Sequence, residues 1–246
     1  IGSMTKFLSK FDVIALSLFL LASVGLSTYL SNKYTPQVLT AALPAPSDLV
    51  KAGLQAPQVE TDVAVFAGGC FWGVQKVFQH TKGVISATSG YAGGKAKDAI
   101  YSMVSTGSSG HAEAVQVRFD PKQVSFEELL QIYFTVAHDP TQRDAQYPDD
   151  GLQYRSAVFY TNDYQKKLTE RYIAQVNALE VFTKPIATVV SPLADSGFYR
   201  AEDAHQNYAT RYPTNAYIAQ FDLPKLEKFK ELLPVLYRES PSLLLN

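Results

Sequence analysis

The sequence predicts a folded domain in which β-strands and α-helices alternate, preceded by an apolar segment. Hydrophobic residues make up 46% of the 246 residues and charged residues 18%, which provides enough apolar material for a packed core. Short β-prone runs alternate with runs of helical spacing over about residues 62–233. Ahead of them, no charged residue occurs between Val13 and Asn32.

The charge balance and the cysteine count narrow the function. The formal net charge is −1, so nothing in the composition indicates a nucleic-acid partner. The chain has one cysteine, Cys70, which excludes an intrachain disulfide and a zinc site built on paired cysteines. A lone cysteine is most often a small buried hydrophobe, so a functional role must be argued from its surroundings.

Residues 1–10 are interpreted as a vector-derived remnant followed by a basic flank that contains Lys6 and Lys10. Residues 11–32 are predicted to be a signal anchor or transmembrane segment, because about 20 apolar residues span a bilayer as a helix. A buried core helix is the alternative, but the apolar residues lie all round the helix rather than on one stripe.

Small residues at 22–25 leave a cleaved signal peptide open, although an uncleaved anchor is favoured. The lysines before the segment predict an N-terminus inside the cytoplasm. We therefore expect the rest of the chain, membrane-anchored or secreted, to lie outside the cytoplasm, on the periplasmic or extracellular side.

Residues 33–61 contain several prolines without any periodic pattern, which is typical of an extended tether or linker. A folded domain is expected at 62–236, followed by a tail at 237–246. The strands are expected at 63–66, 84–89, 114–119, 156–160 and 186–190. The helices are expected at 70–80, 125–136, 163–178, 202–211 and 223–233.

Cys70 follows two glycines at the point where the first strand gives way to a helix. Gly68 and Gly69 permit a tight turn, which places Cys70 in the first helical turn, where free N–H groups and the helix dipole stabilise an anion. Because helix N-termini lower the pKa of a cysteine, the position favours a reactive thiolate. A merely packed cysteine is the alternative.

Other residues extend this hypothesis. Phe71 and Trp72 form an apolar pocket or pack in the core. Glu113, at the start of an expected strand, is a candidate general acid with a raised pKa, or a solvated loop carboxylate. Tyr101 and Tyr154 carry hydroxyls that can donate to a polarised oxygen, although any one of 15 tyrosines is more often structural.

Six segments, with Tyr101 between the second and the third, form an ordered set. They are Gly69-Cys-Phe-Trp-Gly73, Gly90-Tyr-Ala-Gly-Gly94, Gly107-Ser-Ser-Gly-His-Ala-Glu113, His138-Asp-Pro-Thr141, Asp149-Asp-Gly-Leu-Gln-Tyr-Arg-Ser156 and Phe198-Tyr-Arg-Ala-Glu-Asp-Ala-His-Gln206. Over about 62–222 they resemble the A-type peptide methionine sulfoxide reductases. The resemblance implies an α+β fold, a two-layer, ferredoxin-like sandwich around a mixed β-sheet, here preceded by one apolar N-terminal helix.

The resemblance also implies a role for each matching residue. Cys70 would attack the sulfur of a methionine S-sulfoxide, free or in proteins, and become a sulfenic acid. Glu113, Tyr101 and Tyr154 would hydrogen-bond the sulfoxide oxygen, with Glu113 as proton donor. No bound cofactor and no metal are expected, and the protein is expected to be a monomer. The substrate-binding residues would be Phe71, Trp72, Asp149, Gly69 and His111.

The sequence departs from this family at the second cysteine that many members carry near the C-terminus. Ile218 stands about where that cysteine would be, and Ser105 stands where some members have another. An external thiol must then reduce the sulfenic acid, either thioredoxin or glutathione with glutaredoxin.

Two rival interpretations remain. Cys70 with His111 or His205 could serve an acyl transferase or peptidase, since Cys–His pairs perform that chemistry. Alternatively, the chain could be a membrane-tethered module without enzymatic activity. Neither explains the ordered segments.

Overall fold

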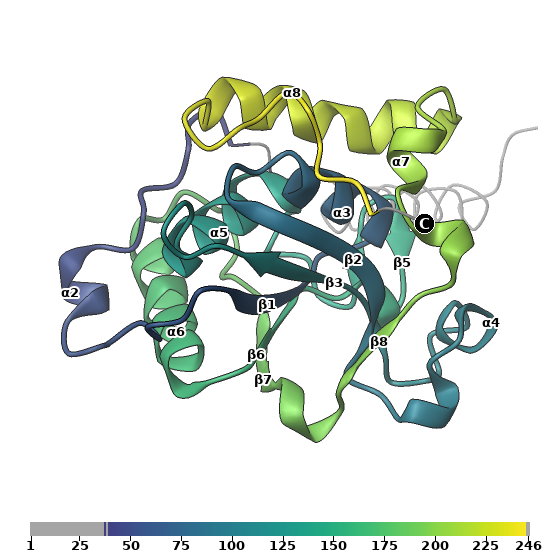
Figure 1. The fold of residues 1–246 in the computed structure, drawn as a ribbon, viewed down its shortest axis with the longest axis horizontal. Coiled ribbons are helices and arrows are strands. Elements are labelled where there is room, and N and C mark those ends of the chain that lie inside the picture. Colours follow the sequence, from purple (N-terminus) through teal and green to yellow (C-terminus); the bar gives the residue numbers. More distant parts are fainter. Residues whose placement is uncertain (1–36, 38, 245–246) are drawn as a thin grey trace, which may run out of the picture. The chain divides into compact units, whose positions relative to one another are not determined.

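A computed structural model describes residues 37 and 39–244, and Figure 1 shows their fold. The expected basic flank at 1–10 and apolar segment at 11–32 lie outside the described residues. Among the residues that are described, no helix combines the length and the apolar character needed to cross a bilayer.

A mixed six-stranded sheet forms the centre of the domain, as expected (Figure 1). Its strands lie in the order β7-β6-β1-β3-β2-β8. Only β6 and β7 pair in parallel, and the other neighbours are antiparallel. The bounds are β1 (Asp62–Ala67), β2 (Val84–Ala92), β3 (Ala112–Phe119), β6 (Ala157–Tyr160), β7 (Val189–Pro192) and β8 (Phe198–Arg200). A separate ribbon pairs β4 (Ala145–Gln146) with β5 (Asp149–Asp150).

The central strand β1 is buried on both faces. Ala64 and Phe66 join the larger apolar cluster, whereas Val65 and Ala67 join a smaller, alanine-rich cluster. This split follows from the two-residue period of a strand. Phe66 stacks on Phe78 with ring centroids 5.0 Å apart, which ties the sheet to the helix that follows.

Helices of the described region pack their apolar side chains into the larger cluster. Figure 1 shows α3, α5 and α8 together over one face of the sheet. Ser125 and Glu128 form the expected capping box at the start of α5, which passes into a π-helical turn, η2 (Tyr133–Ala137). The helical bounds are α3 (Phe71–Gln79), α5 (Phe126–Ile132), α6 (Asp163–Ala178) and α8 (Leu223–Leu232).

Two expected elements differ from the structure. The strand expected at 186–190 is β7 at 189–192, because Ile186 and Ala187 donate their backbone N–H groups to Asn177 and Pro140 instead of to the sheet. The helix expected at 202–211 is broken into η5 (Asp203–His205) and α7 (Tyr208–Arg211). Asn207 adopts a φ of 55°, which interrupts the helical path.

The interpretation of 33–61 as an extended tether is wrong for much of its described part. Leu43 and Val50 are buried in the larger cluster, and Ser47 caps a short helix, α2 (Asp48–Lys51). The C-terminal segment also packs on the domain: Arg238 donates its backbone N–H to His80, and Ser242 donates to Gln79. Apolar side chains of both segments pack against the larger cluster. Neither the proline content nor the position in the chain predicts this packing.

Candidate active site

A sharp turn between β1 and α3 places Cys70 at the helix start, as the glycines predict. Gly69 has a φ of +88°, and a Cβ there would lie 2.5 Å from the Gln146 side chain. Both the backbone conformation and the close approach therefore require glycine. Cys70 is the N-cap residue of α3, and its side chain is 9% exposed.

The expectation that this position lowers the pKa of Cys70 is not met. Burial raises the pKa well above its ordinary value, and the carboxyl groups of Glu113, Asp222 and Asp149 add to the rise. The backbone N–H of Trp72 opposes the rise but is outweighed. Desolvation and like charge therefore dominate over the helix N-terminus in the free enzyme.

Glu113 lies on β3, on the same face of the strand as Val115 and Val117. That face is directed at the larger cluster and α3. Its side chain is 2% exposed, and Oε2 accepts a 3.0 Å hydrogen bond from the backbone N–H of Phe71. Burial raises the pKa of Glu113 to about 8, and Asp149 contributes to the rise. The site thus holds a protonated carboxyl near neutral pH, beside the helix turn that begins at Cys70.

Two aromatic side chains form the wall next to Cys70. Phe71 is buried and lies 5.9 Å from the ring of Tyr91. Trp72 stacks on Tyr208 at 3.8 Å, and its Nε1–H donates to Nδ1 of His205 at 3.3 Å. These contacts hold the Trp72 indole in one orientation.

Three further groups approach from separate loops. Tyr101 begins α4 (Tyr101–Val104), Tyr154 ends η3 (Leu152–Tyr154), and Asp149 begins β5. Burial and then the charge of Glu113 raise the pKa of each tyrosine, with Cys70 contributing to both. Asp149 also has a raised pKa through burial. Because each of these groups affects the pKa of others in the set, Cys70, Glu113, Tyr101, Tyr154 and Asp149 lie close together in one cluster.

His111 does not join this cluster. Its Nδ1 accepts from the Gly94 N–H at 3.2 Å and its Nε2 lies 3.0 Å from the Lys95 carbonyl oxygen, so the ring fixes a loop. The hydrogen bonds of the described residues include none between Cys70 and a histidine, and His205 accepts from Trp72 instead. The geometry therefore disfavours a Cys–His catalytic pair.

Several residues of the site were not predicted from sequence. Glu202 accepts from the Tyr101 backbone N–H at 2.9 Å and from the Tyr91 hydroxyl at 2.6 Å. The Tyr217 hydroxyl donates to Asp149. Glu202 and His205 lie in a segment used for the resemblance, but no local pattern marks Tyr217.

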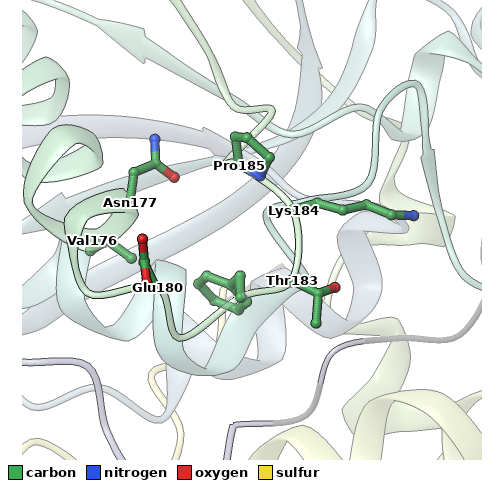
Figure 2. A pocket seen from close by; sticks show the side chains of 7 residues that line it. Val176, Asn177, Glu180, Thr183, Lys184 and Pro185 are labelled. Atoms are coloured by element: carbon green, nitrogen blue, oxygen red, sulfur yellow. The ribbon is translucent and has the colours of Figure 1, made fainter.

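A separate cavity of about 360 Å³ lies beyond the C-terminal end of α6, between Val176 and Pro185 (Figure 2). None of its lining residues belongs to the Cys70 cluster. Among the described residues, no group of three or more His, Cys, Asp or Glu side chains is arranged to hold a metal ion.

Comparison with known proteins identifies the class that this site defines. The family described as peptide methionine sulfoxide reductase matches residues 62–234. Peptide methionine sulfoxide reductase MsrA 2 of Mesorhizobium japonicum is 50% identical over 191 residues, which cover 78% of this chain and 96% of the relative. The chain therefore belongs to the peptide methionine sulfoxide reductase family and is an oxidoreductase.

Two solved structures share the fold. Methionine sulfoxide reductase A of Corynebacterium diphtheriae matches with a TM-score of 0.56 and 32% identity, covering 73% of this chain and 90% of that one. Reduced Mxr1 of Saccharomyces cerevisiae matches with a TM-score of 0.57 and 29% identity, covering 67% and 92%. The mixed sheet and its helices are thus those of this reductase family.

Proposed function

We propose that this protein reduces methionine S-sulfoxide, free or in proteins, with Cys70 as nucleophile and Glu113 as proton donor. The observation that carries the proposal is the hydrogen bond from the Phe71 N–H to Glu113, which holds a buried acid at the helix turn that Cys70 begins. Sulfoxide reduction needs a soft nucleophile for sulfur and an acid for oxygen.

In the reaction, the Cys70 sulfur bonds to the sulfoxide sulfur while Glu113 protonates the oxygen. The hydroxyls of Tyr101 and Tyr154 donate hydrogen bonds to that oxygen. The oxygen passes to Cys70, the bond between the two sulfurs breaks, and methionine leaves. The Cys70 thiol is oxidised to a sulfenic acid as the sulfoxide is reduced, and the proton lost by the thiol replaces the one that Glu113 gave.

Substrate recognition follows from the surrounding groups. Phe71 and Trp72 enclose the methyl group on the sulfur of the substrate. Tyr208 and His205 hold the Trp72 indole in place for this contact. Asp149 holds the substrate backbone, and Gly69 shapes the turn without donating a side chain. His111 supports the loop at 94–95 and acts on the substrate only indirectly.

Regeneration requires an external thiol, because Cys70 is the only cysteine of the chain. Ile218, about where other members carry a second cysteine, has a fully buried side chain within η6 (Ile218–Asp222). A first thiol forms a mixed disulfide and releases water, and a second thiol restores Cys70. Thioredoxin, or glutathione with glutaredoxin, supplies these electrons.

We further propose a monomer without a bound cofactor, whose catalytic domain at 62–236 has a two-layer, ferredoxin-like α+β arrangement. A signal anchor at 11–32 would hold it at a membrane, with the domain on the periplasmic or extracellular side. The lysines ahead of that segment support this orientation.

The decisive assay compares the separate S and R sulfoxides with excess thiol. The wild-type protein is expected to reduce the S epimer, and Cys70→Ser is expected to reduce neither. Activity on the R epimer alone would refute the proposal.

A further inference from the structure

A buried carboxylate packs against the first turn of α3, three residues beyond Cys70. A Cβ on Gly73 would lie 2.0 Å from Oδ1 of Asp222 and 2.8 Å from Nζ of Lys225, so only glycine leaves room for this pair. Lys225 Nζ donates to Asp222 Oδ1 at 3.1 Å. Asp222 ends η6 and Lys225 lies in the first turn of α8. The η6–α8 segment therefore places an ion pair against the helical turn that follows Cys70.

This ion pair is costly as a purely structural contact. Asp222 is 1% exposed, and its Oδ2 has no hydrogen-bond partner among the described residues. An unmet acceptor on a buried carboxylate destabilises the fold, and an apolar pair of the same volume is often as stable or more stable. The arrangement therefore indicates an electrostatic role at the site.

Charged and titratable groups face Cys70 from several elements. They are Glu113 of β3, Asp149 of β5, Tyr101 of α4, Tyr154 of η3, Tyr217 just before η6, and Asp222 of η6. Lys225 is a cation that acts on both Asp222 and Asp149, and Lys76 of α3 also acts on Asp222. Burial raises the pKa of Asp222, and Lys225 opposes that rise. Below pH about 8 Glu113 carries its proton, so Asp222 is then the carboxyl group that most opposes a Cys70 thiolate.

We propose that Asp222 and Lys225 are positioning residues that set the charge state of the Cys70 sulfur, Asp222 opposing the thiolate and Lys225 favouring it. The proposal rests on the proposed role of Cys70 as nucleophile. Through this pair, the η6–α8 segment controls the pH range in which the Cys70 sulfur is reactive, although this segment contains no cysteine.

The test measures the ionisation of Cys70 in the full-length protein, by thiolate absorbance and by the rate of alkylation with iodoacetamide across pH. Cys70 is the only cysteine, so both signals report it alone. Asp222→Asn leaves Lys225 unpaired and is expected to move the midpoint down by about one pH unit, with about tenfold faster alkylation at neutral pH. Lys225→Gln is expected to move the midpoint up by a similar amount.

Opposite shifts separate an electrostatic role from a structural one, since loss of a packing contact would move both variants the same way or neither. Shifts in the same direction, or no shift, would overturn the proposal. If Asp222→Asn does not fold, Lys225→Gln decides alone: an upward shift supports the proposal, and any other result refutes it. Lys230→Gln, which removes the exposed Lys230–Glu239 pair from the same helix, is the control and is expected to shift nothing.

The titration also keeps this proposal separate from the proposed function. It reads the ionisation of Cys70 whether or not Cys70 attacks a sulfoxide. Failure of the proposed function would instead appear as full activity in Cys70→Ser.

Discussion

The Glu113 carboxylate oxygen Oε2 and the Phe71 backbone N–H lie 3.0 Å apart, joined by a buried hydrogen bond across 42 positions of the chain. The bond fixes an acid from β3 on the first turn of α3, directly after Cys70. It satisfies an N–H that the helix itself leaves unpaired, and it occupies one oxygen of the carboxyl. The other oxygen remains to carry the proton.

The substitution Glu113→Gln tests the acid. Gln keeps the shape and can still accept from Phe71, but it has no acidic proton to transfer. We expect kcat/KM for the S-sulfoxide to fall by about 10²- to 10⁴-fold with the fold retained. Glu170→Gln on the exposed side of α6 is the control and should leave the rate unchanged. A Glu113→Gln enzyme as fast as wild type would exclude this residue as the donor.

The raised pKa of Glu113 also predicts how stability depends on pH. A folded-state pKa of about 8 lies above the ordinary carboxyl value of 4.5, so the native state holds a proton that the unfolded state has lost. This contribution is fully present below the ordinary value and disappears as pH rises through about 8. Relative to Glu113→Gln, the wild-type free energy of unfolding should fall by about 1.4 kcal/mol per pH unit within that window. Urea denaturation at several pH values measures it, and parallel curves for the two proteins would contradict the prediction.

Trp72, the only tryptophan of the chain, allows the substrate pocket to be tested through the ring that holds it. Its stacking on Tyr208 at 3.8 Å holds the indole in place. Tyr208→Leu is expected to raise KM about fivefold, since an aromatic pair contributes about 1 kcal/mol beyond its buried area. Tyr212→Leu, on a half-exposed residue that contacts Tyr208 rather than Trp72, is the matched control. An equal rise in KM for both variants would argue against a specific role for the Trp72 stack.

Regeneration is tested by counting turnovers. Without added thiol, one equivalent of methionine should form per enzyme, and mass spectrometry should show Cys70 with one added oxygen or its condensation product. Addition of dithiothreitol should restore continuous turnover. Repeated turnover in the absence of any thiol is the result that this mechanism cannot accommodate.

Gly69 is expected to be indispensable for the turn that carries Cys70. Gly69→Ala places a Cβ at a φ of +88° and against Gln146, so the stability loss should be about 2 kcal/mol or more, with activity lost as Cys70 moves. Gly53→Ala is the matched control, because Gly53 has a φ of +70° but no atom within 4 Å of the added Cβ. It should cost only the backbone strain, about 1 kcal/mol. Equal losses in thermal or urea denaturation would mean that the Gln146 contact contributes nothing.

Much of the fold follows from local patterns. The strands β1, β3 and β6 and the helix α6 lie where local sequence predicts them. β1 and β6 are short apolar runs, β3 alternates apolar and polar residues, and α6 repeats its apolar residues at helical spacing. The errors lie where side chains from distant segments replace local hydrogen bonds. Asn207 breaks the expected helix because its N–H donates to Gln75 and its side chain accepts from Gln79, both on α3.

The sequence by itself identified the residue that we expect to act as the nucleophile. A glycine turn before a helix singles out Cys70, and the ordered segments add Glu113, Tyr101, Tyr154 and Asp149. Only the tertiary structure decided how strongly the Cys70 thiol holds its proton, and which residues from distant segments surround it. Burial and three carboxyl groups outweigh the helix N-terminus at Cys70, and Asp222, Lys225 and Tyr217 arrive from a C-terminal segment without any local signal. Helix position is readable from neighbouring residues, whereas desolvation and the approach of distant charges exist only once the chain has folded.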